Sequence, residues 1–360
     1  MTSAPSPESA QRILIVRLSS MGDVLHALPA AVMLRRAFPH ASIGWLIEER
    51  WAELLCALSA PRSGPRSPER PLVDTVHVVK LKQWRSSLFA AQTWERIGAS
   101  LSDLHARHYD VAVDLQGAIR SAILARWSGA RTIYGAAQPR ENASSLWYSR
   151  KILTRRPHVV EQNAELAETV IGHASQIPDP VLPCDQAAEE SVGKRLREAG
   201  MQNVGMLNPG AGWGAKQWPA EGYGLVARAL SQQDVQCVIN FGPGEEALAK
   251  AAEVASAGTA RAMSFSIGEL IALTRRARLF IGGDTGPMHL AAALHIPVLA
   301  LFGPTDPARN GPFRTRSIVL RHPASPTALT HRHDPDPGLL AITPGEVVAA
   351  ARKLLENSRG

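Results

Sequence analysis

The sequence predicts an α/β protein with two halves, each built on a parallel sheet, and three observations support this prediction. Short apolar runs alternate with longer segments of helical periodicity along the whole chain, which is typical of successive βαβ units. The chain has 360 residues, 45% of them hydrophobic, which is enough to bury two cores. A stretch punctuated by prolines, at 176–183, divides the alternation near its middle.

The N-terminal half contains four apolar runs of strand length, separated by segments with apolar residues at helical spacing. These patterns predict strands at 13–18, 43–47, 76–79 and 111–115, and helices at 24–37 and 93–106. A stretch rich in Pro, Ser and Arg, at 59–71, is expected to form an exposed loop.

The connector at 176–183 cannot be helical, because proline lacks the backbone N–H of a helical turn and its ring clashes with the preceding turn. We place the boundary there, with an N-terminal domain at 1–180, a C-terminal domain at 181–342 and a final helical segment at 343–360. The second half predicts strands at 204–208, 235–241, 279–282 and 298–302, and helices at 223–230, 268–276, 287–294 and 344–357.

Charge and composition limit the classes of partner. A formal net charge of +7 and a pI of about 9.7 favour an anionic partner: nucleic acid, an acidic lipid surface or a phosphorylated substrate. Scattered basic residues and only 5% aromatic residues argue against nucleic acid, and plain solubility is the alternative. Three widely separated cysteines indicate neither a disulfide framework nor a zinc site. Because the first apolar run, 13–16, is too short for a signal peptide or membrane span, we expect a cytoplasmic protein.

The segment 280–294 is the strongest local signal, because a short apolar strand is followed by two glycines and a helix. Glycines let backbone N–H groups approach an anion, Asp284 or Thr285 can cap the helix, and Pro287 suits its first turn. The unpaired amides and the dipole of such a helix favour phosphate. The segment therefore predicts a site for a phosphorylated ligand.

Two further positions in the second half have alternative interpretations. Lys216 ends a glycine-rich loop after a predicted strand, where it can neutralise a diphosphate or be a solvated surface lysine. Glu269 falls in a first helical turn, where a carboxylate is favoured in any case; near a nucleotide cleft it can accept hydrogen bonds from ribose hydroxyls.

In the first half, Asp23 follows the first predicted strand by a few residues and falls at or beside a helix N-terminus. This position faces the carboxyl edge of the sheet, where ligand clefts form. Asp23 is either an N-cap, for which Asp is favoured, or a general base. The turn has no G-x-G-x-x-G sequence, which argues against an NAD-dependent dehydrogenase.

Several motifs, in this order and spacing, resemble glycosyltransferase family 9, the heptosyltransferases, over nearly the whole chain. They are Ser-Ser-Met-Gly-Asp-Val-Leu-His at 19–26, Asp-Leu-Gln-Gly-Ala-Ile-Arg-Ser-Ala at 114–122, Gly-Asp-Thr-Gly-Pro-Met-His-Leu at 283–290 and Phe-Gly-Pro-Thr-Asp-Pro at 302–307. The resemblance implies a GT-B architecture: two Rossmann-like domains facing across a cleft, the N-terminal one holding the acceptor and the C-terminal one ADP-heptose. It also implies an inverting, metal-independent reaction with no cofactor.

The same resemblance implies the roles of individual residues. Asp23 would take the proton from a hydroxyl of Kdo on Kdo-lipid A as that oxygen attacks the heptose anomeric carbon. The backbone amides of Thr285 and Gly286, together with Lys216, would stabilise the leaving diphosphate.

For the donor sugar and nucleoside, the resemblance implies that Asp284 binds heptose hydroxyls, that His289 lies near the phosphates or the sugar, and that Glu269 binds ribose. The alternative for His289 is a helix-face histidine bonded to backbone.

The resemblance also supplies five acceptor-binding candidates: Lys82, Trp84, Arg85, Arg120 and Arg140. A planar guanidinium suits the carboxylates and phosphates of such an acceptor. For Trp84 and its basic neighbours, an amphipathic surface turn is the alternative. The same basic residues can attract the anionic cytoplasmic face of the inner membrane, so we expect peripheral attachment there.

Three alternatives remain open. Within the family, the acceptor can be a core that is already heptosylated, which the segment 114–148 argues against. From other classes, the chain can be a nucleotide-sugar-binding module without turnover, or an epimerase with the same two-domain fold. Asp23 discriminates between these classes, since a binding module needs no carboxylate opposite the diphosphate site.

Overall fold

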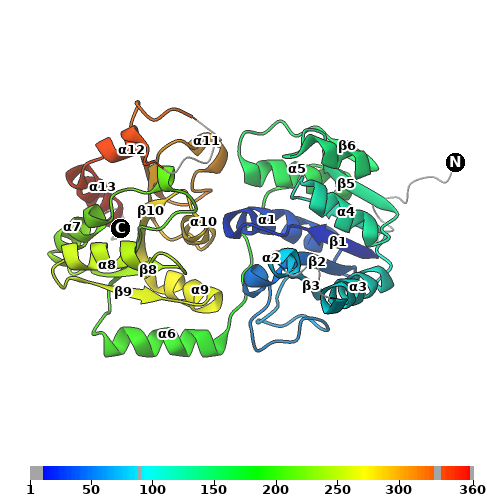
Figure 1. Ribbon diagram of the computed structural model, residues 1–360, viewed down its shortest axis with the longest axis horizontal. Coiled ribbons are helices and arrows are strands. Elements are labelled where there is room, and N and C mark those ends of the chain that lie inside the picture. The colour runs from blue at the N-terminus through cyan, green and yellow to red at the C-terminus, as the bar shows by residue number, and fades with distance from the viewer. Residues whose placement is uncertain (1–10, 87–90, 328–333, 357–360) are drawn as a thin grey trace. The chain divides into compact units, whose positions relative to one another are not determined.

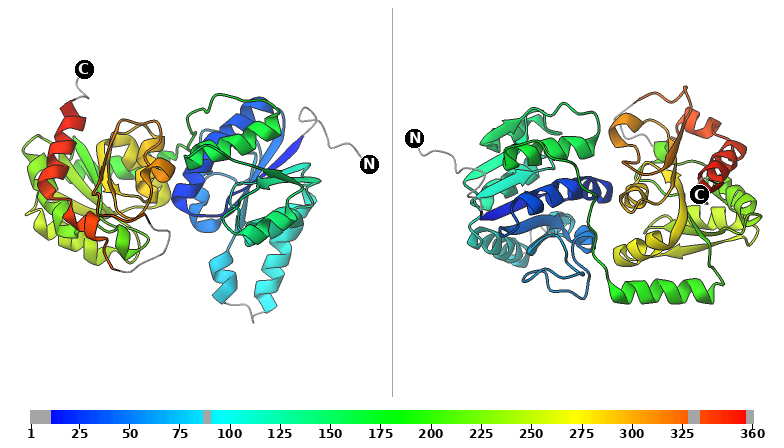
Figure 2. Two further views of the ribbon diagram at one scale, coloured as in Figure 1. Left: turned by 90° about the horizontal axis from the view of Figure 1, so that it is seen from above. Right: turned by 180° about the vertical axis from the view of Figure 1, so that it is seen from behind.

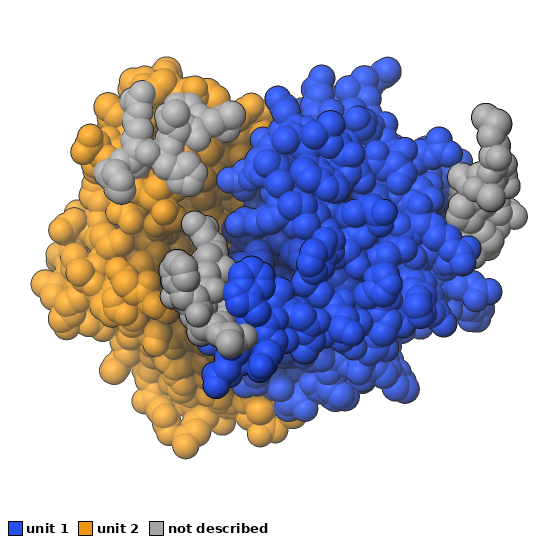
Figure 3. Space-filling view, turned by 45° about the vertical axis from the view of Figure 1, so that its right-hand side comes forward, with its two compact units in different colours: residues 1–185 blue, residues 186–360 orange. Residues whose placement is uncertain are grey.

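The computed structural model describes residues 11–86, 91–327 and 334–356. The chain divides between Asp185 and Gln186 into two compact units, which Figure 3 shows in different colours. The connector at 176–183 has no regular secondary structure, as its prolines predict. We describe each unit by itself.

Unit 1 contains a six-stranded parallel sheet in the order β3-β2-β1-β4-β5-β6 (Figure 1). Its strands are β1 (Arg12–Val16), β2 (Ser42–Glu48), β3 (Thr75–Val79), β4 (Val111–Asp114), β5 (Thr132–Ala136) and β6 (Arg150–Ile152). Its helices are α1 (Met21–Ala37), η2 (Glu49–Leu54), α2 (Leu81–Ser86), α3 (Ala91–Ala106), α4 (Ile119–Trp127), η3 (Asn142–Trp147) and α5 (Val159–Ile171). Helices α1 and α5 pack together on one face, and α3 and α4 on the other (Figures 1 and 2).

Unit 2 repeats this plan with a parallel sheet in the order β12-β11-β10-β7-β8-β9. Its strands are β7 (Val204–Asn208), β8 (Gln236–Phe241), β9 (Ala260–Ser264), β10 (Ala277–Gly283), β11 (Val298–Phe302) and β12 (Ser317–Arg321). Its helices are α6 (Gln186–Glu198), η4 (Gly214–Lys216), α7 (Ala220–Ser231), α8 (Glu246–Ala255), α9 (Ile267–Arg276), α10 (Gly286–Ala293), α11 (Pro307–Asn310), α12 (Pro337–Ala341) and α13 (Pro344–Glu356).

Both sheets have the Rossmann order, in which the third, second and first strands are followed by the fourth, fifth and sixth. The prediction of two parallel α/β halves is therefore confirmed. In this topology the chain reverses direction across the sheet between the first and fourth strands, and ligands bind at the carboxyl ends of those strands. The relevant edges are those of β1 and β4 in unit 1, and of β7 and β10 in unit 2.

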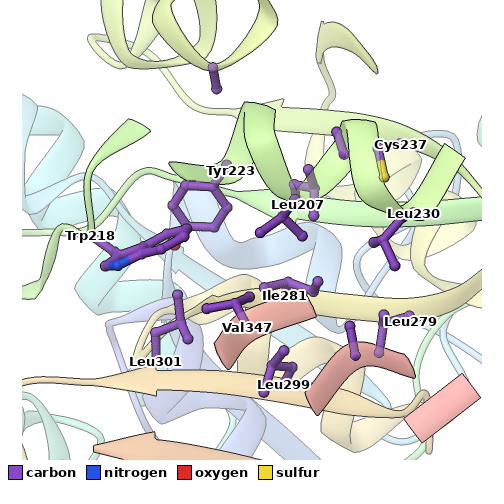
Figure 4. Packing of buried hydrophobic residues seen from close by; sticks show 14 of the residues in the cluster. Leu207, Trp218, Tyr223, Leu230, Cys237, Leu279, Ile281, Leu299, Leu301 and Val347 are labelled. Atoms are coloured by element: carbon purple, nitrogen blue, oxygen red, sulfur yellow. The ribbon is translucent and has the colours of Figure 1, made fainter. Parts of the chain in front are cut away.

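The core of unit 2 packs its sheet against α7 and against the final helix, α13 (Figure 4). Leu207, Ile281 and Leu299 come from adjacent central strands, and Tyr223 and Val347 come from α7 and α13. Strands buried on both faces are nearly all apolar, which explains why the sequence predicted them. The final helix is thus part of the core of unit 2 rather than an appendage.

Within the described ranges, no helix is both long and apolar enough to cross a bilayer.

Candidate functional site

In unit 1, the N-cap of α1 is Ser20, and Asp23 is the third helical residue. The N-cap interpretation of Asp23 is therefore wrong by three positions, because the helix begins before the predicted start at residue 24. Asp23 Oδ2 instead accepts hydrogen bonds from Ser20 N (2.9 Å) and Ser20 Oγ (3.1 Å). A carboxylate at this position satisfies an amide at the helix N-terminus and is fixed in direction by it.

The other oxygen of Asp23 lies 2.6 Å from Arg17 Nη2, and the side chains are 31% and 9% exposed. Burial raises the pKa of the Asp23 carboxyl, but the Arg17 guanidinium and the hydrogen bonds from Ser20 together lower it below its ordinary value. Asp23 is consequently ionised at neutral pH and still partly open to solvent. Sequence reasoning missed Arg17; the signal is a basic residue that directly follows the apolar run 13–16.

A buried carboxylate, Asp114, holds the turn after β4. Asp114 Oδ1 accepts from the amides of Gln116 (2.8 Å) and Gly117 (3.2 Å), and Oδ2 from Tyr148 OH (2.7 Å) and Ser121 Oγ (2.9 Å). Burial raises the pKa of Asp114, and these hydrogen bonds oppose that rise.

The turn fixed by Asp114 also positions the segment between β1 and α1, the helix that contains Asp23. Gln116 Oε1 accepts from the backbone amides of Leu18 (2.9 Å) and Ser19 (3.2 Å). The segments after β1 and β4 are thereby tied together where the Rossmann order places a ligand site. Neither contact could be predicted from the spacing of the motifs.

Two acceptor candidates lie at this edge of unit 1. Arg120 Nη2 is 3.5 Å from Ser19 Oγ. Arg140 is exposed, and the segment that carries it is fixed by Glu141, whose amide donates to Gly117 O (2.9 Å) and whose Oε2 accepts from Ile119 N (2.8 Å). Gly117 has a φ of +67°, and a Cβ there would lie 3.1 Å from Arg140 N. The structure therefore brings Arg120 and Arg140 to the same turn.

The other acceptor candidates lie in α2. Trp84 is only 8% exposed and packs in the apolar core with Val79 and Leu104, so its ring is a core element and is not presented to solvent. The side chains of Lys82 and Arg85 lie outside the part of the chain that the structure describes.

In unit 2, the predicted phosphate segment forms the exit of β10 and the start of α10. Thr285 is the N-cap, Gly286 is the first helical residue, and Pro287 follows it. The first amides of a helix have no partner within the helix and, with its dipole, attract anions. Thr285 Oγ1 makes no capping hydrogen bond to this helix.

Next to this helix start, Asp284 binds two basic side chains. Asp284 Oδ2 lies 2.6 Å from Lys216 Nζ, and Oδ1 lies 3.1 Å from His289 Nε2. All three side chains are largely buried. Burial raises the pKa of Asp284, but His289 and Lys216 lower it far more, to well below its usual range. The alternative of a solvated Lys216 does not describe this cluster, and His289 bonds a carboxylate through Nε2.

Two features of the loop allow Lys216 to reach Asp284. A Cβ on Gly283 would lie 3.1 Å from Lys216 O, so a glycine permits this close approach. Trp218, 2% exposed, anchors the end of the loop by packing edge-on to Tyr223 and donating from Nε1 to Ile342 O (2.9 Å).

Glu269 lies at the start of α9, after the edge strand β9. Its Oε2 accepts from Ser266 N (3.0 Å), and Ser266 Oγ accepts from Glu269 N (3.2 Å), so the two residues form a capping box. Oε1 accepts from Ser191 Oγ (2.7 Å), and Oε2 lies 3.7 Å from Arg195 Nη1. Strands β7 and β8 lie between β10 and β9. Glu269 and Lys216 therefore both lie at the carboxyl ends of the strands, but they do not contact each other.

The exits of β7 and β8 carry a buried amide pair to which the sequence assigned no role. Asn240 Nδ2 donates to Asn208 Oδ1 (2.7 Å), and Asn208 Nδ2 donates to Gly210 O (3.0 Å). These bonds fix the start of the loop that ends at Lys216. In the sequence, the signal for this amide pair is a polar residue at or near the end of each apolar strand.

Comparisons of the amino-acid sequence with known proteins identify relatives of this chain. A family model described as glycosyltransferase family 9 (heptosyltransferase) matches residues 98–339. Lipopolysaccharide heptosyltransferase 1 of Escherichia coli is 29% identical over 317 residues, which cover 87% of this chain and 94% of that protein. The protein of the same name from Pseudomonas aeruginosa is 28% identical over 318 residues, covering 86% and 83% of the two chains.

Solved structures give the same result. The chain is similar to the E. coli heptosyltransferase WaaC with ADP-2-deoxy-2-fluoro heptose, with a TM-score of 0.73 and 26% identity, covering 96% of this chain and 99% of that one. A family 9 glycosyl transferase from Veillonella parvula has a TM-score of 0.79 at 21% identity, covering 96% and 98%, a likeness that concerns the fold alone.

Proposed function

The chain belongs to glycosyltransferase family 9, and from this premise we propose that it transfers heptose from ADP-L-glycero-D-manno-heptose to Kdo of Kdo-lipid A. This is the activity of a heptosyltransferase I in the synthesis of the lipopolysaccharide inner core. The chain is a glycosyltransferase, and its two Rossmann-like units have the fold class of the GT-B enzymes. The observation that carries the proposal is an ionised, partly open Asp23 held at the ligand edge of unit 1.

In the proposed reaction, unit 1 holds the acceptor and Asp23 is the general base. A Kdo hydroxyl loses its proton to Asp23 as its oxygen forms the bond to the heptose anomeric carbon, and the bond from that carbon to the ADP oxygen breaks. Attack from the face opposite the leaving group inverts the anomeric configuration. Arg17 keeps Asp23 ionised, while Arg120 and Arg140 supply positive charge for acceptor carboxylates or phosphates.

In the same proposal, unit 2 holds ADP-heptose. The diphosphate lies at the start of α10, where the amides of Thr285 and Gly286 donate to it and Lys216 adds a positive charge. These groups stabilise the charge of departing ADP without a metal ion. Asp284 binds heptose hydroxyls, His289 lies near the phosphates or the sugar, and Glu269 takes the ribose hydroxyls.

Two aspects of the proposal concern location and the exact acceptor. A lipid acceptor and a net charge of +7 favour peripheral attachment to the cytoplasmic face of the inner membrane. An already heptosylated acceptor, as for a heptosyltransferase II, is the alternative within the family.

A fold alone does not separate a transferase from an epimerase or a binding module. An ionised carboxylate at the ligand edge of unit 1, Asp23, argues against a module that only binds, because binding needs no general base.

The test compares Asp23→Asn with the wild type, supplying ADP-heptose and Kdo-lipid A and measuring ADP release and ADP-heptose affinity separately. We expect kcat to fall by about 10²- to 10⁴-fold while donor affinity is retained, because a general base contributes about this much. Glu161→Gln is the matched control, since Glu161 is also a first-turn helix carboxylate of unit 1. Near-normal turnover of Asp23→Asn would overturn the assignment, and loss of wild-type turnover in EDTA would overturn metal independence.

A further inference from the structure

Helix α4 exposes large apolar side chains together with arginines. Ile119, Ile123 and Trp127 are 37%, 36% and 56% exposed. Because they recur every four residues, they lie on one face of the helix. Arg120 and Arg126 are exposed as well, and α4 contains no acidic residue.

These side chains occupy one limited sector around the helix axis. At about 100° per residue, the five exposed positions fall within an arc of about 120°. Arg126 lies at one border of that arc and Arg120 at the other. The three apolar side chains, Ile119, Ile123 and Trp127, lie between them. We call this surface the α4 face.

The neighbours of α4 extend the surface without reversing its charge. Leu146, 77% exposed, belongs to η3, which packs against α4. The carboxylate of Glu141 is directed at the α4 N-terminus, where it accepts from Ile119 N. Helix α3 differs: its Trp94 is 59% exposed, yet Glu95 and Asp103 are exposed on the same helix.

We propose that the α4 face docks onto an anionic lipid bilayer. This inference rests on the proposed function, since the acceptor is a lipid. Exposed apolar side chains bury themselves at the boundary between headgroups and acyl chains, and tryptophan favours that depth. Arginines at both borders then meet lipid phosphates, and α4 itself carries no carboxylate that would repel them.

The α4 face is also continuous with the acceptor half of the site. Helix α4 follows the turn after β4, and its Arg120 reaches Ser19 beside the segment that carries Asp23. Docking by α4 therefore keeps this edge of unit 1 near the membrane, where the sugar headgroup of the acceptor lies. Trp84 of α2 is buried in the core, so the membrane contact that the sequence suggested for its neighbourhood cannot use that ring.

The experiment measures co-sedimentation of the full chain with phosphatidylethanolamine vesicles that contain phosphatidylglycerol, and with pure phosphatidylcholine vesicles. The variant is Ile123→Ser/Trp127→Ser, two exposed positions outside the proposed machinery. The matched control is Trp94→Ser/Val254→Ser, with residues 59% and 66% exposed on other helices. Transfer is assayed in parallel onto Kdo-lipid A in vesicles and onto the deacylated acceptor in solution.

We expect the wild type and the control to prefer the anionic vesicles, and the α4 variant to lose at least about tenfold in partitioning. Its transfer onto the vesicle-bound acceptor should fall in parallel, with transfer onto the deacylated acceptor unchanged. Equal partitioning of variant and wild type, or no wild-type binding to anionic vesicles, would overturn the docking proposal. Failure of the wild type to transfer heptose onto either acceptor would instead count against the proposed function and leave the vesicle-binding result standing.

Discussion

Arg17 Nη2 lies 2.6 Å from Asp23 Oδ1, so the proposed base is also half of an ion pair. The ion pair keeps the carboxylate ionised, but it also lowers the pKa of Asp23 and thereby weakens it as a base. Arg17, six residues earlier in the chain, thus acts together with Ser20 to set the position and the protonation state of this side chain.

The first prediction concerns the pH dependence of transfer in Arg17→Gln. Removing the guanidinium leaves the burial of Asp23 in place, so the pKa of its carboxyl should rise. Because the base must be ionised, the acid limb of kcat/KM against pH should move to higher pH. Arg50→Gln, which removes the partner of Glu48, is the control and should leave the profile unchanged. An unshifted acid limb in Arg17→Gln would contradict this role for Arg17.

The second prediction concerns ADP binding by Lys216→Ala. A hydrogen bond to a charged group contributes about 1.5–3 kcal/mol, so ADP affinity should fall by about 10- to 100-fold. Isothermal titration calorimetry with ADP checks this, and Lys250→Ala, whose side chain is 71% exposed, is the control. If both variants bound ADP as the wild type does, Lys216 would serve only to neutralise Asp284.

The third prediction links Asp284 to stability at acidic pH. Its pKa is lowered in the folded protein, so it contributes stability above its unfolded-state pKa of about 3.9 and loses that contribution as pH falls toward the folded value. Asp284→Asn should therefore be less stable at neutral pH, and its deficit should shrink below about pH 4. Thermal unfolding at a series of pH values measures the deficit; a deficit independent of pH would exclude an electrostatic origin.

The fourth prediction separates the two roles of Glu269. Glutamine also closes a capping box, so Glu269→Gln should keep α9 stable while weakening ADP binding if the carboxylate takes ribose hydroxyls. Ser266→Ala removes the cap and should cost about 0.5–2 kcal/mol of stability. Denaturant unfolding and ADP titration of both variants provide the comparison. Unaltered ADP affinity in Glu269→Gln would leave Glu269 as a capping residue only.

Local patterns predicted the central strands of both sheets because those strands are apolar on both faces. Four strands escaped prediction: β5, β6, β9 and β12. Of these, β6 (Arg-Lys-Ile) and β9 (Ala-Arg-Ala-Met-Ser) carry no apolar run. The start of α1 was misplaced because Met21 and Gly22 precede the first clear helical pattern, although Ser20 is a favourable N-cap.

The two α/β halves and the glycine turn before α10 could be predicted from local patterns, because periodicity, turn residues and capping preferences act over a few neighbouring residues. The charge partners at the candidate site could not be predicted in this way. Lys216 and Asp284 are 68 positions apart, and they meet because β7 and β10 are adjacent and Gly283 leaves room for the loop. The Arg17–Asp23 ion pair likewise depends on the turn that Asp114 and Gln116 hold. Strand order and close packing bring distant residues together, and neither can be inferred from the local spacing of residues.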